Sequence, residues 1–144
     1  MIIIESNIDD LDYIYNLSLN RIKNSTLTKD ELKSYYQDNN VKILKIVNNN
    51  LLIIGYAIIR ISIDEAEIDE IAIDKNNEGH GYGTLLLKEI DNLLISKNIK
   101  NIFLEVRSKN IRAINLYIKN NYKEYRLRKN YYIDDDALCL VKEL

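Results

Sequence analysis

The chain switches repeatedly between two hydrophobic periods, and each switch marks the edge of an expected element. β-Branched apolar runs predict strands, whereas apolar residues three to four positions apart predict amphipathic helices. Strands are predicted over residues 1–5, 41–47, 51–63, 66–74, 101–107, 122–128 and 137–142. Helices are predicted over residues 9–20, 28–37, 82–96 and 111–120. This order of elements predicts an α+β (mixed α/β) fold, a mixed sheet with helices on both faces.

Polar residues between the periodic segments supply the expected caps and turns. Asp9 or Asp10 is placed to cap the first helix. Residues 28–31, Thr-Lys-Asp-Glu, form a capping-box pattern for the second helix. Three asparagines at 48–50 separate two apolar runs and predict a hairpin. Since no repeat, linker or low-complexity segment divides the 144 residues, one domain over residues 1–144 is expected.

The composition argues against a nucleic-acid-binding, membrane-spanning, secreted or metal-binding protein. A net charge of −2 argues against a nucleic-acid partner, and no apolar run approaches the ~20 residues of a membrane-spanning helix. The first residues lack the pattern of a signal peptide, so a cytoplasmic protein is expected. A single histidine, His80, and a single cysteine, Cys139, predict neither a metal site nor a disulfide. Cys139 lies in an apolar run and is expected to be a buried strand residue.

Three of the four glycines, Gly79, Gly81 and Gly83, lie within five residues between a predicted strand and a predicted helix. Glycine permits close backbone approach, and a helix start offers free N–H groups and the positive end of the helix dipole. This combination favours a phosphate or pyrophosphate site over a flexible turn. The spacing matches neither a Walker A loop, which has lysine before its Ser or Thr, nor the Rossmann G-x-G-x-x-G pattern.

Residues 70–84, EIAIDKNNEGHGYGT, resemble the acetyl-CoA motif of the GNAT acetyltransferase superfamily, Q/R-x-x-G-x-G/A between a strand and a helix. Gly81 and Gly83 match the glycines of the motif, and Glu78 stands where Gln or Arg is usual. The resemblance implies the GNAT fold, a mixed, mostly antiparallel sheet of six to seven strands flanked by about four helices. It also implies acetyl-CoA as co-substrate.

The second half of the chain resembles the RimI type more narrowly, the ribosomal-protein-alanine N-acetyltransferases, which acetylate a protein's N-terminal α-amine. The matching segments are LEVRSKN at 104–110, Ala113, LY at 116–117, RKNYY at 128–132 and DAL at 136–138. The likeness covers roughly residues 51–144 and is weaker over the first 40 residues. It implies acetyl-CoA-dependent transfer to an amine by direct attack in a ternary complex.

Glu105 is the predicted general base. Strand alternation places Glu105 on the same face as Phe103 and opposite the apolar Leu104. A carboxylate beside an aromatic residue in a cleft suits the removal of a proton from an amine. The resemblance assigns this role to the same position, whereas the pattern alone equally allows a surface ion pair between Glu105 and Arg107.

Tyr117 is the predicted general acid, which would donate a proton to the CoA sulfur. The resemblance singles it out, because helical spacing alone describes a core tyrosine. Asn110 precedes the same helix and is expected to cap it, and the resemblance adds a contact to the CoA arm.

The remaining site residues are also implied by the resemblance. The pantetheine and the thioester carbonyl would contact main-chain groups of Ile71, Ala72 and Ile73. The pyrophosphate would lie against Gly79, His80, Gly81, Tyr82, Gly83 and Thr84, with the side chain of His80 facing solvent. The acceptor peptide would be held by Arg128, Asn130 and Tyr131.

The acceptor is the part that the sequence leaves most open. The acidic run at 134–136 is expected to be a solvated turn, but it could also attract a cationic amine. A protein N-terminus, such as that of a ribosomal protein, is the first expectation. A small amine such as a polyamine, an amino acid or an aminoglycoside is the alternative. A non-catalytic acyl-CoA-binding module is a third interpretation, and monomer and homodimer both remain open.

Overall fold

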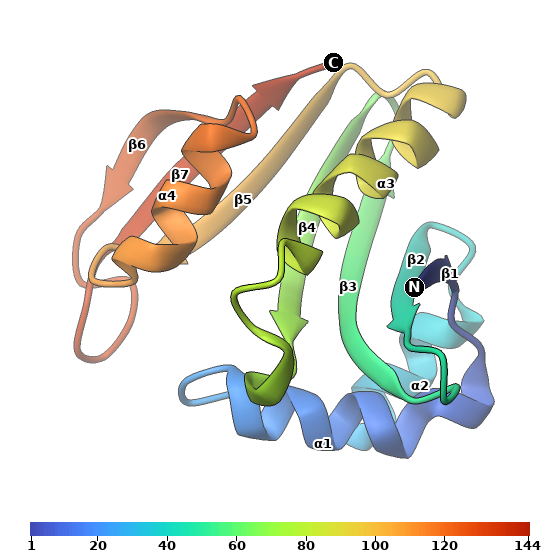
Figure 1. The fold of residues 1–144 in the computed structure, drawn as a ribbon. Helices are drawn as coiled ribbons and strands as arrows, with labels where there is room; N and C mark the ends of the chain where they lie inside the picture. The colour runs from blue at the N-terminus through green and yellow to red at the C-terminus, as the bar shows by residue number, and fades with distance from the viewer.

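The computed structural model describes residues 1–144 and builds them around one seven-stranded sheet (Figure 1). The strands are β1 (Ile2–Glu5), β2 (Val41–Val47), β3 (Ile53–Ser62), β4 (Glu65–Ile73), β5 (Asn101–Arg107), β6 (Lys123–Arg128) and β7 (Ala137–Glu143). The α-helices are α1 (Leu11–Arg21), α2 (Lys29–Gln37), α3 (Tyr82–Ser96) and α4 (Ile111–Lys119), with short 3-10 turns η1 (Ile8–Asp10) and η2 (Lys75–Asn77). The predicted α+β class is confirmed, and every predicted element is present within two residues of its expected bounds.

The strand order is β1-β2-β3-β4-β5-β7-β6, and only the β4–β5 pair is parallel. A parallel pair needs a crossover connection, and α3 supplies it between β4 and β5. The glycine-rich turn therefore lies where the crossover leaves β4 and enters α3. The same connection places the start of α3 beside the C-terminal ends of both parallel strands.

Side chains cap the 3-10 turn before α1 and the start of α2. Asp10 occupies the expected N-cap position of α1 but makes no side-chain hydrogen bond to the helix start. Asn7 caps the preceding 3-10 turn η1, because its Oδ1 accepts the N–H of Asp9 at 2.9 Å. Asp10 completes this cap, since its carboxylate accepts the N–H of Asn7 at 3.1 Å. Thr28 caps α2 as predicted, because its hydroxyl oxygen accepts the N–H of Glu31 at 3.1 Å. The pattern located both helix starts, and local hydrogen bonding chose the capping residue.

The two faces of the sheet bury separate apolar cores. On one face α3 and α4 pack against the sheet through side chains such as Leu86 and Ile90, which are fully buried. On the other face α1 and α2 pack through Ile14 and Leu32 against Tyr56 of β3. Figure 1 shows α3 and α4 in front of the strands and α2 behind them. Apolar burial on both faces makes the centre of the sheet a rigid support for the segments at its edge.

The parallel strands β4 and β5 separate along their length. They pair from Glu65 with Asn101 to Ile68 with Leu104, and no pairing continues beyond that point. Figure 1 shows the two strands diverging toward their C-terminal ends. The divergence opens a wedge in the middle of the sheet, where backbone groups of both strands are free to meet a ligand.

A β-bulge in the β3–β4 pair changes which side chains of β4 face which core. Ile58 pairs with Glu70 and Ile59 pairs with Ile68, so Asp69 is an extra residue on β4. Ile68 belongs to the core under α3 and α4, whereas Ala72 belongs to the core under α1 and α2. Without the extra residue these two positions would share a face. The bulge therefore directs Glu70 toward α1.

Candidate active site

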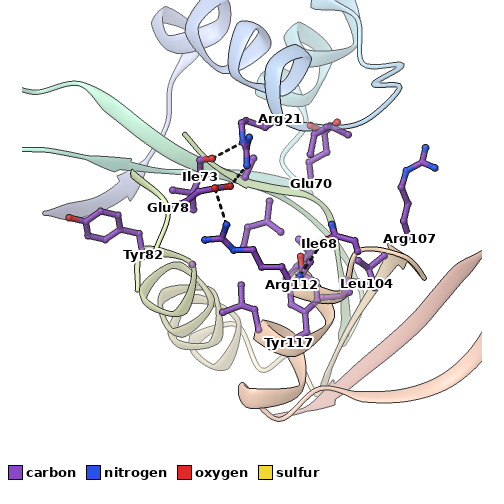
Figure 2. Close-up of a pocket in the computed structure, with 18 of the residues that line it drawn as sticks. Arg21, Ile68, Glu70, Ile73, Glu78, Tyr82, Leu104, Arg107, Arg112 and Tyr117 are labelled. Carbon is purple, nitrogen blue, oxygen red and sulfur yellow. Dashed lines mark hydrogen bonds and ion pairs between the residues drawn. The ribbon is translucent and has the colours of Figure 1, made fainter. Parts of the chain in front are cut away.

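A pocket of about 520 Å³ occupies the wedge between β4 and β5 (Figure 2). The end of α1, the glycine-rich turn and α4 complete its wall. Of the residues predicted from the sequence, it is lined by Ile71, Ala72, Ile73, Gly79, Gly81, Tyr82, Gly83, Thr84, Glu105, Asn110 and Tyr117. The pocket is not lined by His80, Arg128, Asn130 or Tyr131. Both residues expected to move protons thus face one cavity with the expected cofactor residues.

The glycine-rich turn has the backbone of an anion-binding site. Gly79 and Gly81 have φ values of 79° and 81°, in the left-handed region that residues with a Cβ avoid. Gly81 caps α3 without any side-chain hydrogen bond to the helix start, and the first turn of α3 carries no acidic residue. Gly83 is needed for close packing rather than for a positive φ, because a Cβ there would lie 3.0 Å from Leu116 of α4. The turn therefore presents free N–H groups to the pocket, and α3 packs closely on α4.

Glu78, which precedes these glycines, is held between two arginines. Its Oε1 atom is paired with Arg21 at the end of α1, and its Oε2 atom lies 3.0 Å from Nη1 of Arg112 on α4. Nε of Arg21 also donates to the carbonyl of Ile73, at the end of β4, at 3.0 Å. Figure 2 shows the three charged side chains meeting at the edge of the pocket. One carboxylate between two guanidinium groups leaves the cluster with a formal charge of +1, so Glu78 brings no uncompensated negative charge to the glycine-rich turn.

Glu105 lies in the wedge with a cation and a thiol beside it. Alternation along β5 is as expected, with Leu104 buried and Glu105 on the opposite face. Nη1 of Arg128 lies 3.4 Å from Oε1 of Glu105, and the thiol of Cys139, buried in β7 as expected, lies 3.9 Å from the same oxygen. The alternative ion pair with Arg107 is not formed, because Arg107 pairs with another carboxylate. The side chain of Glu105 is 22% exposed, so it is shielded yet open to the pocket.

Tyr117 is both a core residue and a pocket residue. Its ring is 6% exposed and makes an edge-to-face contact with Tyr122, with centroids 5.8 Å apart. Burial, and to a smaller extent the charge of Tyr132, raises the pKa of Tyr117 above its usual value. The phenol consequently keeps its proton throughout the physiological range, which is the state that a general acid requires.

The side chain of Asn110 caps the start of α4. Its Oδ1 atom accepts the N–H of Ala113 at 3.2 Å, as the capping interpretation expected. Asn110 also lines the pocket. The geometry accordingly accommodates both expectations for this residue, a helix cap and a place beside the bound arm.

Of the three residues expected to hold the acceptor peptide, Arg128 and Tyr131 lie beside Glu105, and none of the three lines the main pocket. Arg128 and Glu105 together line a second hollow of about 370 Å³ on β3–β6. Tyr131 is exposed, and the charge of Glu105 is the main cause that raises the pKa of its phenol. Asn130 has a φ of 54°, and its N–H donates to Asp136 at 2.8 Å, so it shapes the turn. The adjacent Tyr132 lines the main pocket instead.

The acidic run at 134–136 forms a turn in which Asp134 is paired with cations and Asp135 accepts hydrogen bonds. Asp134 lies 2.6 Å from Lys23, in the loop after α1, and 2.6 Å from Arg107 of β5. These two cations lower the pKa of Asp134 to about 2. Asp135 accepts the N–H of Lys109 at 3.0 Å, and its hydrogen bonds lower its pKa as well. The run thereby joins the β6–β7 loop to the loop after α1, across one side of the pocket.

Several residues of the pocket were not anticipated from the sequence. They include Arg21, Ile22, Lys23, Glu70, Arg107 and Arg112. Arg112 lies beside a segment that carries the resemblance, so its neighbours gave a sequence signal for it. Residues 21–23 had no such signal, because they reach the pocket only through the packing of α1 under the sheet.

No group of three or more His, Cys, Asp or Glu side chains is arranged to hold a metal ion. None of the helices is both long and apolar enough to span a membrane.

The chain is similar to known acetyltransferases in sequence and in fold. The family described as Acetyltransferase (GNAT) family matches residues 9–122. A [ribosomal protein bS18]-alanine N-acetyltransferase of Haemophilus influenzae is 43% identical over 62% of this chain, and the match spans 60% of that relative's length. A Bacillus subtilis protein that provisionally carries the same name is 30% identical over 92% of this chain and 89% of its own.

Solved structures share the fold over almost the whole chain. The crystal structure of the ribosomal-protein-S18-alanine N-acetyltransferase of Escherichia coli superposes with a TM-score of 0.90 at 25% identity. The superposition covers 99% of this chain and 92% of that one. A GNAT family acetyltransferase of Elizabethkingia anophelis, solved with acetyl-CoA bound, has a TM-score of 0.83 at 20% identity over 99% and 97% of the two chains, which shows the shared fold.

Proposed function

The chain belongs to the acetyltransferase (GNAT) family, as its sequence predicted, and from that premise we propose its reaction. It transfers the acetyl group of acetyl-CoA to an amine, by direct attack in a ternary complex. The acceptor is a protein N-terminal α-amine of the ribosomal-protein-alanine type, and the enzyme acts in the cytoplasm as one domain over residues 1–144. The observation that carries the proposal is that Glu105 and Tyr117 line the same pocket as the glycine-rich turn.

The residues around the turn suit the phosphates of acetyl-CoA. The free N–H groups at the start of α3 face the pocket, and the Arg21–Glu78–Arg112 cluster adds a net positive charge beside them. Residues 71–73 of β4 have no strand partner on the side of β5, because the strands diverge there, although the carbonyl of Ile73 accepts from Arg21. Acetyl-CoA supplies the acetyl group as a thioester. This chain therefore has donors for an anionic end and a free strand edge for an extended arm.

Glu105 and Tyr117 account for the proton transfers. An ammonium acceptor must lose a proton before its nitrogen can attack, and Glu105 is the carboxylate placed to take it. The departing thiolate needs a proton, and the phenol of Tyr117 holds one because burial raises its pKa. The thiol product carries the proton from Tyr117, and the amide carries the acetyl group. Each positioned group is expected to contribute about 10²–10⁴-fold to the rate.

The relatives favour a protein acceptor over a small amine. Two of them carry a name that states alanine N-acetylation of the ribosomal protein bS18. The acidic run, which motivated a small cationic acceptor, has its Asp134 charge paired with Lys23 and Arg107. Arg128 and Tyr131 beside Glu105 offer a surface for residues that follow the N-terminal one.

A steady-state assay of released thiol tests the proposal. The acceptors are peptides that start with Ala, Ser or Met, together with spermidine and free amino acids. We expect turnover on the Ala-starting peptide, with the Glu105→Gln variant nearly inactive. Turnover on small amines alone would replace the acceptor and keep the chemistry. Binding of acetyl-CoA without turnover on any amine would instead favour the binding-module interpretation.

A further inference from the structure

Glu70 is a carboxylate of the pocket that has no role in the proton transfers described above. Glu70 of β4 follows the bulge that turns its side chain toward α1. Oε1 of Glu70 accepts a hydrogen bond from the hydroxyl of Ser18 at 2.8 Å and another from the phenol of Tyr56 at 2.6 Å. Ser18 and Tyr56 are fully buried, so the carboxylate is held from behind by two fixed donors. Figure 2 shows Glu70 on the α1 side of the pocket, across from Tyr117.

The charge of Glu70 distinguishes it from the other glutamates of the site. Glu78 is paired with two arginines, and Glu105 has Arg128 within 3.4 Å. Glu70 forms no ion pair, although it is half-buried and lines the cavity. Both of its hydrogen bonds reach one oxygen, Oε1, and none reaches the other. A partly desolvated carboxylate without a cation is a ready partner for a positively charged ligand group.

The position of Glu70 on the wedge indicates which cation it would meet. The last paired residues of the two parallel strands are Ile68 and Leu104. Glu105 comes directly after this point on β5, and Glu70 comes two residues after it on β4, beyond the bulge residue Asp69. A group that enters the wedge between the strands therefore lies between the two carboxylates, and an amine acceptor arrives there as an ammonium.

We propose that Glu70 binds the acceptor's ammonium group and thereby selects a charged N-terminal amine. The inference rests on the proposed acetyl transfer and adds the residue that recognises the acceptor. The ammonium first forms an ion pair with Glu70, and Glu105 then takes one proton to free the nitrogen lone pair. The nitrogen forms its bond to the acetyl carbon as the carbon–sulfur bond breaks. The second amine proton leaves to solvent, and the thiolate takes the proton of Tyr117.

The test compares an ammonium ligand with a neutral one. Calorimetry measures binding of an Ala-starting peptide to the complex with CoA, and binding of the same peptide with lactate in place of the alanine. Glu70→Gln keeps an oxygen that accepts from Ser18 and Tyr56 but removes the charge. Glu89→Gln, on the exposed side of α3, is the matched control for loss of one negative charge. Thermal unfolding checks that each variant folds.

We expect the Glu70→Gln variant to bind the alanine peptide about tenfold more weakly, since charged hydrogen bonds are worth more than neutral ones. Binding of the lactate peptide and of CoA should be unchanged, and Glu89→Gln should match the wild type. Equal weakening of both peptides, or no weakening, overturns the assignment of Glu70. The assignment of Glu70 is also overturned if the wild type binds the alanine peptide no more tightly than the lactate peptide. The same peptide then serves in the thiol assay: a wild type that prefers the ammonium but turns over no amine overturns the proposed reaction and leaves the assignment of Glu70 intact.

Discussion

The two sides of the pocket are built in different ways. The proposed donor side, residues 71–84 with the start of α4, presents mostly main-chain groups from a segment continuous in sequence. The acceptor side uses side chains from distant segments, such as Lys23 after α1 and Asp134 before β7, which meet at 2.6 Å. A backbone cradle suits a co-substrate whose structure never varies. Side chains on connecting loops can be exchanged without disturbing the sheet, so the acceptor side is where specificity can change.

Three residues join the two sides. Arg21 belongs to α1, Glu78 to the glycine-rich turn and Arg112 to α4, and their charges meet in one cluster. Arg21 also bonds to the end of β4 at Ile73. Binding on the donor side is thus connected physically to the end of α1, which lines the acceptor side. The comparison can be tested by variants that act on chemistry, on the donor side alone, or on the loops alone.

The largest effect is expected from Glu105→Gln. The amide cannot take the amine proton, so kcat should fall by about 10²–10⁴-fold while the Kd of acetyl-CoA stays constant. Steady-state kinetics and calorimetry measure the two quantities, with Glu89→Gln as the control of equal charge. A fall of less than threefold in kcat would remove Glu105 from the chemistry.

Tyr117→Phe is expected to lower kcat by on the order of 10²-fold, because the ring still fills the core but the proton donor is lost. The exposed Tyr13→Phe is the control. The raised pKa of Tyr117 also has a direct consequence for the pH profile. Since the phenol stays protonated well above neutrality, kcat should show no alkaline decline from Tyr117 up to about pH 10. An unchanged kcat in the phenylalanine variant would assign leaving-group protonation to water.

Charge changes in the Arg21–Glu78–Arg112 cluster should alter donor binding in opposite directions. Glu78→Gln raises the formal charge of the cluster and should tighten acetyl-CoA by on the order of threefold at low salt. Arg112→Gln lowers the charge and should weaken binding by a similar factor. Calorimetry at low and high salt checks both, because screening should shrink each effect. Changes of the same sign in the two variants would contradict the electrostatic account.

The smallest effect is expected from Asp134→Asn, and it concerns acid stability. The folded-state pKa of Asp134 is lowered to about 2 from 3.8, so its contribution to stability is fully present above pH 3.8 and is lost as the pH falls toward 2. The asparagine variant should therefore lose less stability than the wild type across that interval. Unfolding curves at several pH values measure this, with acetyl-CoA affinity at neutral pH as the reference that should not change. A parallel pH dependence in both proteins would show that the ion pairs with Lys23 and Arg107 are not maintained in solution.

Local patterns were sufficient for the elements and for the position of the glycine-rich turn. Periodicity placed α3 and β5 at their observed bounds, because both bury one continuous apolar face. The glycine spacing located the turn, since positive φ at Gly79 and Gly81 is a local backbone demand. Choices between competing local hydrogen bonds were harder to predict. Asp10 occupies the N-cap position of α1 as expected, but the capping hydrogen bonds form one turn earlier, at Asn7 of η1.

Sequence by itself determined the family and the order of elements, and it supplied the candidate residues for the chemistry, because all of these depend on short-range spacing. Only the tertiary structure decided the electrostatic partners: Arg128 rather than Arg107 for Glu105, and Arg21 with Arg112 for Glu78. It also decided that Glu70 faces the pocket, through the single extra residue of a bulge. Such partners come from segments tens of residues apart. They are brought together by the packing of helices on a twisted sheet, and no local spacing encodes that arrangement.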